Sequence, residues 1–193
     1  MVAGFNISCV GDYNAYSYLP SRLGNTLSDQ MATHVLDNLV AEYIKYTFLD
    51  RGSDERQYCA PGVDLPVASI MRPKFGAYGE YHTSDDNLDF ISPAGLNGGY
   101  EALRHCLIGL EANKTYKATV LGEPQLGKYG LYPSARKAGD PKPKDMLNIL
   151  AYSDGQTSLL DIAQRINQPI WNLAEPAERL HQAGLLEDVT NER

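Results

Sequence analysis

The chain has 193 residues, and its 43% hydrophobic and 21% charged residues are typical of a globular protein. No stretch approaches the ~20 consecutive apolar residues of a membrane-spanning helix, and no secretory signal pattern opens the chain, so we expect a cytoplasmic protein without membrane association. The 17 Lys and Arg against 24 Asp and Glu give a net charge of −7, which argues against general binding to nucleic acid or anionic lipid.

The first part of the chain alternates strand-like and helical segments. The first strand ends in a turn at Gly11 and Asp12, and the first helix carries Asp29 in its first turn, where the helix dipole favours a carboxylate. The predicted order is strand, helix, strand, strand and helix, at residues 5–10, 27–39, 43–49, 65–71 and 93–110. This order predicts an α/β fold with parallel strand pairing.

The second part of the chain has a different character. Residues 114–144 are rich in Gly and Pro without regular periodicity, so we expect a linker or an arm that wraps a domain. Three short helices and a final strand then indicate a winged helix. Ser158 and Asp161 are spaced as in a capping box, and we expect Pro176 to interrupt the third helix. The predicted domains are residues 1–113, 114–144 and 145–193.

The cysteines do not suggest a metal or disulfide framework. Cys9, Cys59 and Cys106 are odd in number and form no CxxC pair, so reduced and buried thiols are expected.

Polar clusters follow or separate the predicted strands. In an open parallel sheet, ligands bind outside the carboxyl ends of the strands, so loops from those ends can meet. Asp12 and His82 offer a carboxylate and an imidazole, both zinc ligands, and Asp86 is placed to orient the His82 ring or to cap the next element. From the residues alone, Asp12 can equally be a turn residue and His82 a solvated side chain. The 54–58 loop can equally be a run of surface charges that screen one another.

A family resemblance adds to this interpretation. Four segments are distinctive: Asp54-Glu55-Arg56-Gln57-Tyr58-Cys59-Ala60-Pro61-Gly62, Met71-Arg72, Glu80-Tyr81-His82-Thr83-Ser84-Asp85-Asp86, and Gly122-Glu123-Pro124-Gln125-Leu126-Gly127-Lys128. Together they resemble the bacterial aminopeptidase-like family that carries a C-terminal winged helix and is often encoded among surface-polysaccharide genes. The catalytic domain of that family is similar to zinc aminopeptidases with two metal ions.

The resemblance implies roles for particular residues. Asp12 matches the turn that supplies a carboxylate zinc ligand, and His82 with Asp86 matches an HTxxD motif whose His is a ligand. The loop that matches the substrate pocket implies contacts to a substrate amine or carboxylate, from Asp54, Glu55, Arg56 and Tyr58. The implied function is zinc-dependent hydrolysis of peptide or amide bonds.

Length is the main departure from the family. Its members are about twice this size, this chain resembles their C-terminal half, and the upstream metal ligands have no counterpart here. A catalytic zinc keeps about three protein ligands, so Asp12 and His82 fall short. We therefore expect weak or no activity from this chain alone, and a partner in a second copy or in a complementing N-terminal half.

Two alternatives remain open. The chain can be a non-catalytic module for protein interaction or oligomerisation, built on the winged helix. DNA binding is disfavoured because residues 145–193 hold three Arg against eight acidic residues, including Glu175 and Glu178 on the third helix. A hydrolase acting on an amide of a sugar or lipid precursor is the other alternative.

Overall fold

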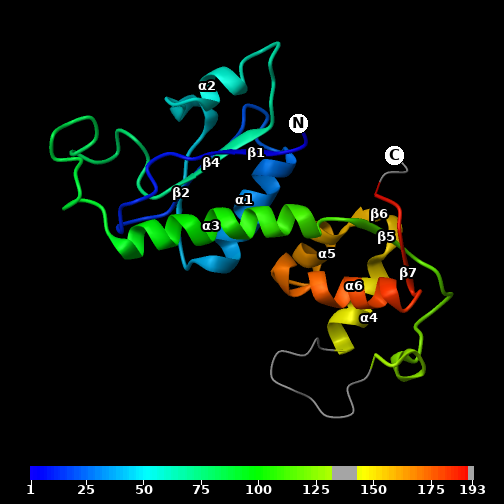
Figure 1. The fold of residues 1–193 in the computed structure, drawn as a ribbon. Coiled ribbons are helices and arrows are strands. Elements are labelled where there is room, and N and C mark those ends of the chain that lie inside the picture. The colour runs from blue at the N-terminus through cyan, green and yellow to red at the C-terminus, as the bar shows by residue number, and fades with distance from the viewer. Residues whose placement is uncertain (132–142, 191–193) are drawn as a thin grey trace. The chain divides into compact units, whose positions relative to one another are not determined.

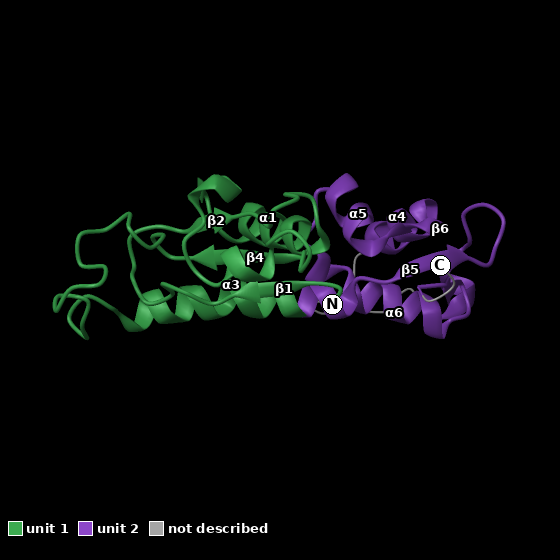
Figure 2. Cartoon of the chain, turned by 90° about the horizontal axis from the view of Figure 1, so that it is seen from above, with its two compact units in different colours: residues 1–107 green, residues 108–193 purple. Residues whose placement is uncertain are grey.

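The computed structural model describes residues 1–131 and 143–190. The chain forms two compact units, residues 1–107 and 108–193, which Figure 2 shows in different colours. None of the helices in these described stretches combines the length and the apolar character needed to cross a membrane.

Unit 1 is built on a four-stranded mixed sheet (Figure 1). The strand order is β1 (Gly4–Asn6), β4 (Val67–Met71), β2 (Ser17–Leu19) and β3 (Ile44–Lys45). The pairs β1–β4 and β2–β3 are parallel, whereas β2 and β4 are antiparallel. The predicted α/β class is therefore confirmed. The expectation of parallel pairing is right for two pairs and wrong for the central pair, because an additional strand, β2, turns back beside β4.

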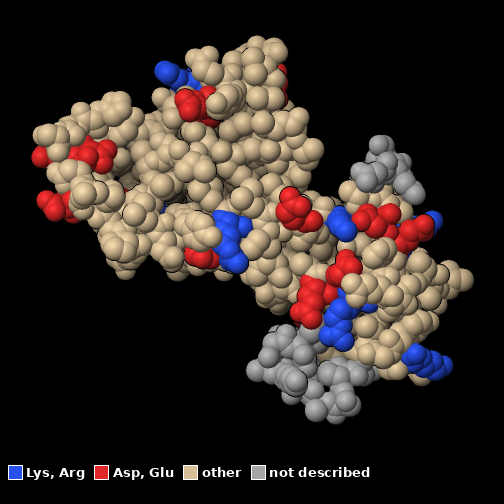
Figure 3. Space-filling model, viewed as in Figure 1, with Lys and Arg blue, Asp and Glu red and all other residues tan. Residues whose placement is uncertain are grey.

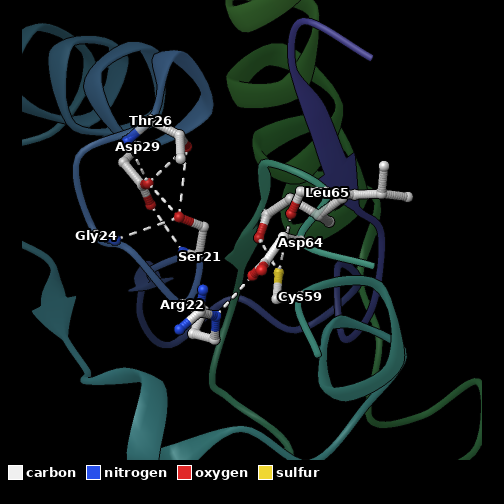
Figure 4. A network of polar contacts seen from close by, with 9 residues as sticks. Ser21, Arg22, Gly24, Thr26, Asp29, Cys59, Asp64 and Leu65 are labelled. Atoms are coloured by element: carbon white, nitrogen blue, oxygen red, sulfur yellow. Dashed lines mark hydrogen bonds and ion pairs between the residues drawn. The ribbon is translucent and has the colours of Figure 1, made fainter. Parts of the chain in front are cut away.

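Helix α1 (Leu27–Leu39) packs on β4 and begins at a dense polar cap (Figure 4). The buried Asp29 carboxylate accepts hydrogen bonds from the Thr26 N–H at 2.9 Å, from the Ser21 N–H at 2.8 Å and from the Tyr18 hydroxyl at 2.8 Å. Burial alone would raise the pKa of Asp29, but the hydrogen bonds, above all those from Ser21 and Thr26, lower it. The cap therefore joins α1 to the chain that follows β2.

Unit 1 also contains short helical segments and most of one long helix, whose last residues, 108–112, belong to unit 2. These elements are the 3-10 helix η1 (Phe48–Asp50), the four-residue α2 (Glu55–Tyr58) and α3 (Pro93–Ala112), the long green helix of Figure 1. Glycines let α3 approach the chain after β1. A Cβ at Gly95 would lie 2.1 Å from the Gly11 carbonyl oxygen, and one at Gly99 would lie 2.7 Å from that of Val10. The position of the Asp12 turn therefore depends on small residues in α3.

Unit 2 has the helices and the sheet of a winged helix. Its helices are α4 (Pro143–Tyr152), α5 (Leu159–Arg165) and α6 (Ala174–Gln182), with the 3-10 helices η2 (Leu126–Tyr129) and η3 (Ile170–Asn172). The antiparallel sheet has the order β6 (Asp154–Ser158), β5 (Thr115–Ala118) and β7 (Leu186–Asp188). The predicted capping box is present, since the Ser158 hydroxyl accepts from the Asp161 N–H and donates to its carboxylate. The core is fully buried at Ile149, Leu160 and Leu180.

Two expectations about this part of the chain differ from the structure. The segment 114–144 was expected to be a linker, but it begins with β5, the central strand of the sheet, because Tyr116 pairs with Asp188 and Lys117 with Glu187. Residues 132–142 of that segment lie outside the described residues. Pro176 does not interrupt a helix, since it is the third residue of α6, where its missing N–H would have no helical partner.

Candidate functional site

A hollow of about 440 Å³ in unit 1 brings together residues that are far apart in the sequence. Asp12 from the turn after β1, and His82 and Asp86 from the loop after β4, all line it. The two predicted metal ligands and the residue expected to orient His82 therefore share one surface. The roles themselves stay predictions.

Asp12 is held firmly by its own turn. Its side chain is buried, and its carboxylate accepts hydrogen bonds from the Tyr13 N–H at 2.7 Å and from the Asn14 side-chain amide at 3.0 Å. The carbonyl oxygen of Asp12 accepts from Arg72 Nε at 2.7 Å, and that of Tyr13 accepts from Arg72 Nη2 at 2.6 Å. The Asn14 N–H adds a longer hydrogen bond at 3.3 Å, so contacts within the turn already use about four acceptor positions of this carboxylate. The turn is thus preorganised around a fixed carboxylate.

His82 is exposed and lies in a turn of unusual backbone conformation. Its φ of 60° is in the left-handed region, which few residues other than Gly adopt, although His is among those enriched there. Its ring stacks on that of Tyr81, with 4.0 Å between the ring centroids. Within the described residues, no hydrogen bond joins His82 to Asp86. The expected contact between Asp86 and the imidazole is therefore not formed in this structure.

The wall of the hollow contains two residues that were not anticipated as part of the site. The Tyr78 hydroxyl contacts Cys9 Sγ at 3.5 Å, and both residues line the hollow. Burial and the contact with Cys9 raise the pKa of Tyr78. The ring of Tyr78 also stacks on Phe90, with centroids 5.1 Å apart. Tyr78 is half-buried and lies between Ala77 and Gly79 in a polar segment, so no periodicity marked it as part of the site.

The loop expected to contact substrate lies elsewhere. None of Asp54, Glu55, Arg56 and Tyr58 lines the hollow. Glu55 is fully buried, and its carboxylate accepts from the Asn6 side chain at 2.9 Å and from the Gly52 and Ser53 N–H groups at 2.7 and 3.0 Å. The structure thus gives Glu55 a part in holding the start of α2, where a substrate contact was expected. Asp54, Arg56 and Tyr58 are exposed, and their role stays a prediction.

The donors present do not make a complete zinc site. In the described residues, no three His, Cys, Asp or Glu side chains lie together in a way that could hold a metal ion. Asp12 and His82 are suitable donors, but a catalytic zinc needs about three protein ligands.

The surface near His82 is acidic. Figure 3 shows acidic side chains gathered over the loop at residues 80–89, which contains Glu80, Asp85, Asp86 and Asp89. On α6, Glu175 and Glu178 are exposed. Clustered carboxylates would repel a phosphate backbone and attract a cationic group. The expectation that nucleic acid is not a partner stays a prediction.

Fold and site together define an α/β protein with a winged helix. Residues 1–113 match the family described as a domain of unknown function, DUF4910, and residues 114–188 match a winged helix-turn-helix family. The chain therefore belongs to the DUF4910 family. This assignment also places β5 within the winged-helix match.

A Clostridium acetobutylicum relative is named "Putative polysaccharide biosynthesis protein with aminopeptidase-like domain" and is 37% identical over 190 residues, and the match covers 96% of this chain and 43% of the relative. The crystal structure of a "putative peptidase" from the same organism has a TM-score of 0.85 and 33% identity, and the similarity covers 98% of this chain and 42% of that one. The chain thus spans about two fifths of the length of these relatives. The aminopeptidase-like character and the winged helix agree with the resemblance seen in the sequence.

Proposed function

We propose that this chain is the C-terminal portion of a zinc-dependent hydrolase that acts on peptide or other amide bonds. In this proposal Asp12 and His82 supply two metal ligands, and residues outside this chain supply the others. The observation that carries the proposal is that Asp12 and His82 line one hollow although they come from loops after different strands. The printed names of the relatives, an aminopeptidase-like domain and a peptidase, support the same class.

The chain's own residues would position these donors. Arg72 fixes the two carbonyl groups of the Asp12 turn, and Gly95 allows α3 to support it from behind. The acidic loop around His82 would favour a substrate with a free amino group, because opposite charges attract. Peptide and sugar-linked amides both fit this description. The name of the relative, which mentions polysaccharide biosynthesis, favours testing both.

The proposal is tested in the full-length Clostridium acetobutylicum relative. Replacing the residue aligned with His82 by Ala, or the one aligned with Asp12 by Asn, should lower zinc content and abolish hydrolysis of an aminoacyl p-nitroanilide. A matched control replaces the residue aligned with Asp85, which is on the same loop but does not line the hollow. Unchanged zinc content and turnover in the first two variants would refute the ligand assignment. Hydrolysis of the same substrate by the 193-residue chain alone would refute the proposal that its active site is incomplete.

A further inference from the structure

A second cavity in unit 1, of about 630 Å³, lies beside the Asp12 turn and contains none of the residues considered above as metal ligands. Residues 13–16 of the turn form one wall, Arg72 at the end of β4 and Ala94 of α3 form another, and the chain at residues 42–44 closes it. All of these lining residues belong to unit 1. This cavity is therefore a feature of one compact unit, and its lining differs from that of the His82 hollow.

Arg72 is an unusual residue in this lining because it is buried and has no acidic partner. It is only 4% exposed, and no carboxylate of the described residues forms an ion pair with it. Its partners are two carbonyl oxygens and the ring of Tyr16, which lies 3.8 Å from Cζ. Removing a charge from water is expensive unless an opposite charge compensates it. The guanidinium therefore retains an uncompensated positive charge at the cavity.

One nitrogen of this guanidinium is still available for a ligand. Nε and Nη2 donate to carbonyl groups. Nη1 has no hydrogen-bond partner among the residues that the structure describes, and it is not completely shielded from solvent. A Cβ at Gly98 would lie 2.6 Å from Nη1, so the lack of a side chain at Gly98 is what lets α3 lie close to this nitrogen. Arg is well suited to carboxylates because its planar fork matches their geometry.

The start of α3 adds a second favourable contribution. Ala94 is the second residue of this 20-residue helix and lines the cavity. The backbone N–H groups in the first turn of a helix lack helical partners, and the helix dipole places partial positive charge there. Gly95 N–H is satisfied by the Ser92 hydroxyl at 2.9 Å, whereas the described hydrogen bonds include none from Ala94 N–H. Arg72 and Ala94 thus line the same space.

The other lining residues indicate the body of the ligand. Tyr13, Tyr16, Tyr43 and Ile44 offer aromatic and aliphatic surface. Glu42 also lines the cavity and is exposed, so a second negative charge on the ligand would be repelled. The lining therefore fits one carboxylate joined to an apolar or aromatic body better than it fits a phosphate or a dicarboxylate.

We propose that this cavity is a binding site for a small organic monocarboxylate, with the carboxylate held by Arg72 Nη1 and the Ala94 N–H and the apolar body lying against the tyrosines. The site needs no metal ion. It therefore does not depend on the proposed hydrolase function, and its failure would leave that function untouched.

The test uses the whole chain and three probes, measured by calorimetry without added metal. These are 3-phenylpropionate, 3-phenylpropionamide, which has the same shape without the charge, and inorganic phosphate. We expect 3-phenylpropionate to bind at least about tenfold more tightly than the amide, since a hydrogen bond to a charged group contributes on that order. Equal binding of acid and amide, no binding of the acid, or tighter binding of phosphate would each overturn the proposal.

A pair of variants tests the location without removing the buried Arg72, whose loss could unfold the turn. Ala94→Glu places a carboxylate at the exposed start of α3, where it should pair with Arg72 and abolish binding of 3-phenylpropionate. Ala94→Gln has nearly the same size without the charge and should retain at least part of the binding. Full binding by the Glu variant, or equal loss in both variants, would show that the anion site is not where we place it.

Discussion

The two compact units differ in how completely they bury their apolar side chains. In unit 2, Ile149, Leu160, Leu173 and Leu180 are fully buried among three helices and a small sheet. Among the described residues, most of the exposed large apolar side chains lie in unit 1, including Leu49 and Leu88, each 84% exposed. Exposed apolar surface of this kind is typical of faces that contact another segment or protein. Unit 2 therefore resembles a self-contained domain, whereas unit 1 has surface available for more structure.

The difference in exposed apolar surface between the two units agrees with the location of the candidate site. The hollow with Asp12 and His82 lies in unit 1, where the ligand set is also incomplete. The relatives have more than half of their length outside the match to this chain. On our account, both the open surface and the missing ligands of unit 1 are completed by residues that this chain does not contain.

The largest expected effect concerns the core of unit 2. Leu180→Ala should lower the free energy of unfolding by about 2–5 kcal/mol, because it leaves a cavity in a well-packed core. Urea unfolding followed by the fluorescence of Trp171, the single tryptophan, measures this unit directly. Leu121→Ala is the control, since Leu121 is fully exposed and its loss should change stability by no more than about 0.5 kcal/mol. Similar effects of the two substitutions would contradict the closed core.

A smaller effect is expected at the α1 cap of unit 1. Asp29→Asn should cost about 1–3 kcal/mol, because a buried acceptor of several hydrogen bonds is replaced by a group that accepts fewer and adds donors. Near-UV circular dichroism of the tyrosines during urea unfolding would report it, with the exposed Asp89→Asn as the control. Equal stability of these two variants would contradict the role of the cap.

The same carboxylate gives unit 1 a specific pH dependence. The pKa of Asp29 is lowered below its ordinary value of 3.8 in the folded chain, so the unfolded chain takes up the proton first as the pH falls. The stabilisation is complete well above pH 3.8 and is lost as the pH falls through the folded pKa. Unfolding measured from pH 7 to pH 2 should show this loss in the wild type and a smaller one in Asp29→Asn. Identical profiles would exclude Asp29 as its source.

The smallest effect concerns thiol reactivity and leaves stability unchanged. Cys59 and Cys106 are buried, and burial raises the pKa of the Cys106 thiol to about 12, which lowers its thiolate fraction. Cys9 is only partly buried and lines the hollow. Under native conditions a thiol reagent should therefore react with Cys9 well before the other two. Cys9→Ser is the control, and it should remove the fast phase of the reaction with the reagent. A fast phase that persists in this variant would show that another thiol is accessible.

Local patterns predicted much of the fold. The spacing of Leu27, Met31 and Val35 identified α1, and Ser158 with Asp161 identified the start of α5, because both signals involve residues within a few positions of each other. Strands β2 and β5 were missed. They have only three and four residues, and their pairing with distant segments, which no local pattern encodes, determines them.

The site was predicted in part for the same reason. Asp12 and His82 could be identified because loops at strand ends tend to meet, and the structure places both at one hollow. The fully buried Glu55 could not be recognised as a structural group, because its partner Asn6 is distant from it in the sequence. Arg72 belonged to a motif, but its buried and unpaired charge is visible only in three dimensions.

Zinc titration of the isolated 193-residue chain, alongside its Asp12→Asn and His82→Ala variants, addresses the central idea most directly. Two donors on one hollow should give weak binding by calorimetry that either substitution removes. Two results would contradict this account: tight stoichiometric zinc binding by the unaltered chain, or zinc binding that persists in both variants. Either would show that Asp12 and His82 do not form one part of a metal site that residues outside this chain complete.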